Sequence, residues 1–217
     1  MIITTPTKYA AGITLWGDYW DLHSLYETIH ELTNGTSFNE DIKETVLGLA
    51  YDVRHAYQRD KEEKKFGHDE YDKVTYRGAK ILWPIILFQL SALREFAAFQ
   101  ATTKEQQSNL FRLEACVEKS LNEVDRNVAA ECIEWLKFPS PITNDYYCLY
   151  LSEASKKYIA DTVSKSRFKK LPNILRSFNP MSEEYKEFTK YLNATTREKG
   201  CSPYELFDFS EEPDFKW

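Results

Sequence analysis

Histidine and carboxylate side chains at helical spacing provide the first candidate for chemistry in this sequence. His23, Glu27 and His30 are four and three residues apart, so a helix would place them on one side. Asp52 and His55 repeat the three-residue spacing. Imidazole and carboxylate groups suit Zn, Fe or Mn, and a Glu-x-x-His pair occurs in carboxylate-bridged metal bundles. These five residues therefore raise the hypothesis of a metal-dependent enzyme.

The direction of these side chains favours a simpler interpretation. At about 100° per residue, His23 and His30 lie roughly 100° or more from the centre of the apolar stripe of their helix. His55 lies nearly opposite the stripe of the next helix. Ligands in a bundle core should face inward, so we favour a solvated polar face with ordinary i,i+3 and i,i+4 contacts. No cofactor is indicated.

Basic residues are concentrated in the segment 156–176, where Tyr158 and Phe168 lie among them and Asp161 is the single acid. The seven are Lys156, Lys157, Lys165, Arg167, Lys169, Lys170 and Arg176. Cations beside aromatic rings are typical of a nucleic-acid contact. The net charge of −6 opposes that role. The alternatives are an acidic protein partner, the acidic C-terminal tail, or a solvated basic face.

Three further residues are candidates for a pocket. Trp16 and Trp20 flank the turn at Gly17-Asp18, where exposed aromatic rings can form a ligand wall. Packing against the start of the following helix is the favoured alternative. Arg94 follows a long apolar run, so it either marks where a central helix reaches the surface or lines a pocket.

The common catalytic motifs are missing. The sequence has no GxSxG, no GxGxxG, no GxxxxGK[ST] and no Cys close to a His. Its four cysteines never approach CxxC spacing. The leading hypothesis is therefore a non-enzymatic binding or regulatory protein that acts through surface contacts, as a homodimer or with an acidic protein partner.

Composition and length predict one globular domain. The chain has 217 residues, of which 42% are hydrophobic and 29% charged. Pro139 and Pro141 suggest a subdomain boundary near 138–144. The most apolar run, 81–90, is interrupted by Pro84 and is too short to span a membrane. With no secretory signal at its start, the protein is expected in the cytoplasm, with reduced cysteines.

Hydrophobic periodicity predicts a predominantly α-helical α+β fold. We expect seven or eight helices around a central apolar helix at about 84–100, with two or three short antiparallel strands. The expected strands are 2–5, 12–16 and 74–83. The expected helices are 19–33, 40 to about 64, 84–100, 103–122, 126–137, 153–170, 172–178 and 182–199, and 146–151 is either strand or helix, with helix favoured.

Two stretches carry a resemblance. GITLWGDYWDLHSLYETIHEL and YRGAKILWPIILFQLSALRE, within Gly12–Glu95, resemble uncharacterised bacterial proteins that pair a strand–helix opening with a strand leading into a Trp-Pro helix start. The resemblance implies a bacterial origin and an unassigned function. It brings no functional residue to this chain.

Overall fold

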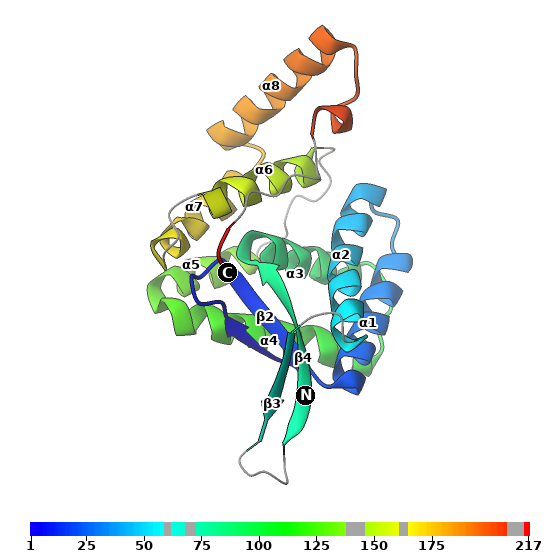
Figure 1. Cartoon of the computed structure of the whole chain (residues 1–217). Coiled ribbons are helices and arrows are strands. Elements are labelled where there is room, and N and C mark those ends of the chain that lie inside the picture. Colours follow the sequence, from blue (N-terminus) through cyan, green and yellow to red (C-terminus); the bar gives the residue numbers. More distant parts are fainter. Residues whose placement is uncertain (59–61, 68–72, 138–145, 161–164, 208–214) are drawn as a thin grey trace.

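A four-stranded antiparallel sheet forms the base on which the helices pack (Figure 1). The computed structural model describes residues 1–58, 62–67, 73–137, 146–160, 165–207 and 215–217. The strands are β1 (Ile3–Pro6), β2 (Gly12–Gly17), β3 (Glu62–Phe66) and β4 (Val74–Leu82), in the spatial order β1-β2-β4-β3. β2 and β4 are the two inner strands, and β2 is buried along its whole length.

Two glycines allow β2 and β4 to approach closely. A Cβ atom at Gly12 would lie 1.9 Å from the carbonyl oxygen of Ile81, and one at Gly78 would lie 2.6 Å from the ring of Trp16. Gly78 therefore leaves the space that the Trp16 ring occupies, which explains a glycine inside a strand.

Eight α-helices and two short 3-10 helices account for most of the other described residues. They are α1 (Tyr19–Asn34), α2 (Glu40–Tyr57), α3 (Trp83–Ala98), α4 (Lys104–Val124), α5 (Arg126–Leu136), α6 (Tyr147–Ala160), η1 (Lys165–Lys170), α7 (Leu171–Ser177), α8 (Glu183–Lys199) and η2 (Tyr204–Leu206). Among the described helices, none combines the length and the apolar character needed to cross a membrane. The helix-dominated α+β architecture expected from the sequence is confirmed.

Helix α3 lies at the centre of the fold. It packs against α1, α2, α4, α5, α6 and α7 as well as the sheet, and most of its side chains are buried. Pro84 lies in its first turn, where a missing N–H costs nothing. The expected central helix at about 84–100 is therefore confirmed.

Local signals fix the ends of several other helices. The Asp18 side chain accepts a hydrogen bond from the Asp21 backbone N–H at 2.8 Å and caps α1. Thr103 and Gln106 form a reciprocal capping box at the start of α4. Gly200, with φ at 65°, ends α8 in the left-handed conformation that glycine adopts readily.

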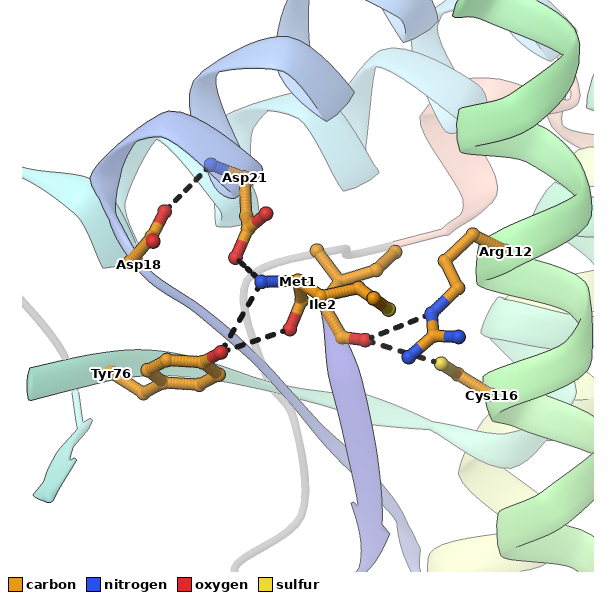
Figure 2. Close-up of polar contacts among 7 residues, drawn as sticks. All are labelled: Met1, Ile2, Asp18, Asp21, Tyr76, Arg112 and Cys116. Carbon is orange, nitrogen blue, oxygen red and sulfur yellow. Dashed lines mark hydrogen bonds and ion pairs between the residues drawn. The ribbon is translucent and has the colours of Figure 1, made fainter. Parts of the chain in front are cut away.

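The first two residues of the chain are held between three elements (Figure 2). The amino group of Met1 contacts the carboxylate of Asp21 in α1 and lies 3.2 Å from the hydroxyl oxygen of Tyr76 in β4. The carbonyl of Ile2 accepts a hydrogen bond from Nε of Arg112 in α4 at 3.3 Å. These contacts join the start of β1 to α1, β4 and α4.

Two expected helices were wrong in their extent. The helix from residue 40 ends at Tyr57 rather than near Lys64, and residues 62–66, expected as solvated helix end and loop, form strand β3. β3 pairs with β4, and Lys80 donates to the Glu62 carboxylate at 2.8 Å. This pairing across the sheet overrides a charged local sequence that has no strand pattern.

The other error concerns the segment expected as one helix over 153–170. Its first part belongs to α6, which already begins at Tyr147, so the choice of helix for 146–151 is confirmed. Lys165–Lys170 instead forms the 3-10 helix η1, which leads into α7. The subdomain boundary expected near 138–144 lies outside the described residues.

Candidate ligand-binding site

Three helices that are distant in sequence enclose a cavity of about 540 Å³, which we call the α2–α3–α6 cavity. On α2, Asp41, Thr45, Gly48 and Asp52 follow one another at steps of three or four residues and so share a face. Ile85 and Gln89 line the cavity from α3, in the same way. The lining from α6 is Cys148, Leu151, Ser152, Ser155, Lys156 and Ile159.

The inner wall of this cavity contains two buried polar atoms without a partner among the described residues. Gln89 is 2% exposed, and its Nε2 donates to the backbone carbonyl of Thr45 at 2.9 Å. Its Oε1 accepts no hydrogen bond in the described part of the chain. Ser155 is 5% exposed, and its hydroxyl also has no hydrogen-bond partner there. Each of these atoms exposes less than 1 Å² to solvent, so both lie beneath the surface of the cavity, where an unsatisfied group costs about 1–3 kcal/mol.

The mouth of the cavity is acidic. Asp41, Glu44 and Asp52 contribute carboxylates from α2, and Lys156 contributes a cation from α6. Tyr204 of η2 lies at the same mouth, where its hydroxyl donates to the carboxylate of Asp41. Figure 1 shows how the chain reaches this point: α8 extends away from the sheet, and the segment after it returns toward α6 and α2.

Cys148 is the thiol of this cavity, and its surroundings keep it neutral. Burial is the largest effect and raises the pKa of the Cys148 thiol to about 11. The hydroxyl of Thr45, 3.3 Å from the sulfur, donates a hydrogen bond that lowers this pKa but does not offset burial. Since the thiolate is the nucleophilic form, the raised pKa disfavours Cys148 as a nucleophile at neutral pH.

The structure brings together some of the residues that the sequence suggested as metal ligands. His23 and Glu27 line an acidic hollow of about 380 Å³ between α1 and the start of α4, with Trp20 at its edge. His23 Nε2 lies 3.9 Å from Glu27 Oε1. His30 does not line this hollow; its ring lies 4.4 Å from the ring of Tyr26.

Asp52 and His55, the second suggested pair of metal ligands, lie in different surroundings. Asp52 lies at the α2–α3–α6 cavity, whereas the ring of His55 lies 4.2 Å from the ring of Tyr51. Within the described ranges, no three His, Cys, Asp or Glu side chains form a group that could hold a metal ion. The described geometry thus gives the metal hypothesis no ligand set.

The seven basic residues of 156–176 do not form one surface. Arg167 is 0% exposed, so its assignment as a nucleic-acid contact is wrong: a fully buried guanidinium cannot reach a phosphate at the surface. Lys157 pairs with Glu153 at 3.4 Å, and Arg176 pairs with Glu131 at 2.8 Å. Lys156 lies at the α2–α3–α6 cavity. The exposed members of η1 are Lys165, Lys169 and Lys170.

Trp16, Trp20 and Arg94 do not share a pocket. Trp16 is 8% exposed and packs in the sheet, where its Nε1 donates to Thr5 Oγ1 at 2.9 Å, whereas Trp20 is 76% exposed. Arg94 forms two hydrogen bonds with Glu114 and lines a separate pocket of about 450 Å³ beside α4 and α5. These three pocket candidates therefore lie in three separate places.

Comparison with sequence models of protein families shows how the whole chain is related to other proteins. The sequence model of DUF6904, a domain of unknown function, matches residues 2–217. The chain belongs to the DUF6904 family. No curated protein and no solved structure matches it. The resemblance to an uncharacterised family, seen in two stretches of the sequence, thus extends over nearly all of this DUF6904 chain.

Sequence reasoning missed most of the cavity of this DUF6904 protein. Asp52 and Lys156 are sequence candidates for other reasons, whereas Gln89, Ser155 and Tyr204 are not among the predicted residues. One signal was available: Gln89 stands inside the apolar run PIILFQLSAL of a helix expected to be buried. A polar side chain in such a run needs a partner.

Proposed function

We propose that this DUF6904 protein is a non-enzymatic binding protein whose small-molecule ligand occupies the α2–α3–α6 cavity. The observation that carries the proposal is the cavity itself, whose lining combines apolar side chains such as Ile85, Leu151 and Ile159 with a small number of polar ones. Small-molecule sites are mostly apolar hollows in which a few polar groups orient the ligand.

Size and chemistry support binding rather than catalysis. A volume of about 540 Å³ falls within the range of small-molecule sites, roughly 300–1,000 Å³. None of the described residues that line the cavity is a histidine, and the one thiol is neutral at physiological pH. The four cysteines are unbridged, which supports a cytoplasmic location as part of this proposal.

The test is a thermal-shift screen of small polar molecules against three forms of the protein. Gly48→Leu inserts a side chain into the cavity, since a Cβ there meets only Gln89 Nε2, at 3.8 Å. Ala98→Leu makes an insertion of similar size in the separate pocket near Arg94 and serves as the matched control. We expect a ligand that raises the Tm of the wild type and of Ala98→Leu, and not that of Gly48→Leu.

Two results would overturn the proposal. One is a ligand that stabilises Gly48→Leu as strongly as the wild type, because it would bind elsewhere. The other is the absence of any stabilising molecule when native mass spectrometry of gently purified protein also shows no bound small molecule.

A further inference from the structure

The pocket near Arg94, which we call the Arg94 pocket, has no part in the proposed function. It lies between α3, α4 and the end of α5, and it shares no lining residue with the α2–α3–α6 cavity. Its volume of about 450 Å³ falls within the range of small-molecule sites, roughly 300–1,000 Å³. The chemistry of its lining therefore decides which class of molecule fits there.

One part of this lining is apolar and reaches the surface. Leu32, Leu110, Phe111 and Leu136 line the pocket. Leu32 and Leu110 belong to the core, whereas Phe111 is 58% exposed. Exposed apolar surface beside a hollow is typical of a contact site. An alkyl chain that lies against these side chains would remove apolar surface from water, which favours binding.

Arg94 gives the same pocket an accessible and oriented cation. Its side chain is 47% exposed, so it offers contact surface to a molecule in the pocket. The carboxylate of Glu114, which is 9% exposed, accepts from Nε and from Nη2 of Arg94, the latter at 2.7 Å. This paired contact holds the guanidinium plane in place, so little side-chain freedom remains to be lost on binding a ligand.

Glu114 uses only part of the donor capacity of Arg94. A guanidinium has five N–H donors, and Glu114 accepts from one on Nε and one on Nη2. Both N–H groups of Nη1 and the second one of Nη2 remain, and no acceptor among the described residues contacts them. Two parallel N–H groups of this kind match the two oxygens of a carboxylate.

The other charged groups of the lining are Lys137 and Glu95. Lys137 donates to Glu134 at 2.8 Å and adds a second cation. Glu95 is the one acid among the described lining residues, and its charge opposes an incoming anion. The preference for an anion thus rests on the remaining donors of Arg94 and not on the net charge.

We infer that the Arg94 pocket binds a monocarboxylate with an alkyl chain, an amphipathic acid of the fatty-acid class. Its carboxylate accepts hydrogen bonds from Nη1 and Nη2 of Arg94, and its chain lies against Leu110, Phe111 and Leu136. This inference goes beyond the proposed function. Either can hold without the other, because the two cavities share no lining residue.

Calorimetry with octanoate and octylammonium, which carry opposite charges on chains of equal length, tests the ligand class. Both are titrated into the full chain at neutral pH and below the concentrations at which they form micelles. We expect one octanoate site per chain and octylammonium binding at least about tenfold weaker, because an ammonium group has no acceptor for Arg94. Shortening octanoate to hexanoate should weaken binding about fourfold for each buried methylene removed.

Three variants locate the binding. Arg94→Lys keeps a cation beside Glu114 but loses the parallel donors, so octanoate should bind about tenfold more weakly. Glu95→Gln removes the opposing charge and should strengthen binding about two- to fivefold, the scale of one partly exposed charge. Arg176→Lys is the matched control, because Arg176 pairs with Glu131 at 2.8 Å outside the pocket, and it should leave the affinity unchanged.

Four outcomes would overturn the inference. One is octylammonium binding as tightly as octanoate, and another is equal octanoate affinity in Arg94→Lys and the wild type. A third is the absence of octanoate binding to the wild type, which would leave the proposed function standing. The last is octanoate binding that is lost in Gly48→Leu and kept in Arg94→Lys, which would place the acid in the α2–α3–α6 cavity.

Discussion

Two buried serines illustrate how much a single hydroxyl depends on its partner. Ser120 of α4 is 0% exposed and shares a hydrogen bond of 2.7 Å with Thr4 Oγ1 of β1. Ser155 of α6 is nearly as buried, but its hydroxyl has no hydrogen-bond partner in the described part of the chain. The two residues therefore form a matched pair: the Ser120 hydroxyl stabilises the fold through a hydrogen bond, and the Ser155 hydroxyl forms none within the described residues.

Alanine at each position should have opposite effects on stability. Ser120→Ala breaks a buried hydrogen bond and leaves Thr4 with one partner fewer, so the free energy of unfolding should fall by about 1 kcal/mol. Ser155→Ala removes an unsatisfied group, so the free energy of unfolding should stay constant or rise by up to about 1 kcal/mol. Urea denaturation of both variants measures this. Equal destabilisation would show that Ser155 has a partner in the unliganded protein.

Among the secondary-structure elements, the best predicted were those with both an apolar stripe and a cap. Helix α1 combines regularly spaced leucines with the cap Asp18, and the central helix combines a long apolar run with Pro84. β3 has neither, because four of its five residues are charged and exposed. Its strand state is set by pairing with β4, which no local pattern reveals.

The β3–β4 hairpin, which projects beyond the helices in Figure 1, should depend on one aromatic side chain. The ring of Phe66 lies 5.9 Å from that of Trp16 and 5.0 Å from that of Tyr76. Because Phe66 is only half-buried, Phe66→Ala should lower the free energy of unfolding by about 1–2 kcal/mol, less than a fully buried phenylalanine. The neighbouring exposed Lys65→Ala should change it by less than about 0.5 kcal/mol. Chemical denaturation compares the two, and equal effects would contradict this role of Phe66.

At the level of the whole molecule, the cavity was hidden from sequence reasoning because it is assembled by tertiary packing. Its lining residues range from Asp41 to Tyr204 and come from α2, the end of β4, α3, α6 and η2. Residue spacing predicts neighbours only within one helix. It therefore places His23 near Glu27, but it does not reveal that Asp41 and Tyr204 are neighbours. Burial of Gln89 follows from the apolar run around it, whereas the missing partner of its Oε1 is visible only in three dimensions.

The stability of the whole chain should fall in alkaline solution. Burial raises the pKa of Cys148 from 9.0 to about 11 and that of Cys132 from 9.0 to about 12. Above pH 9 the unfolded thiols release protons that the folded thiols keep, so stability that is complete below pH 9 is lost as the pH rises toward 11–12. Denaturation between pH 8 and 11 measures the slope. Cys132→Ala should reduce the slope of stability against pH, whereas Cys201→Ala, at a partly exposed cysteine, should leave it unchanged. An equal slope in the wild type and both variants would contradict the role of the buried Cys132 thiol.

The hydroxyl of Tyr204 at the cavity mouth has a consequence for the rate of exchange. It donates to the carboxylate of Asp41, which ties η2 in the C-terminal segment to the start of α2. A ligand that has to displace this contact would enter and leave the cavity more slowly, so two ligands of equal affinity could differ in residence time.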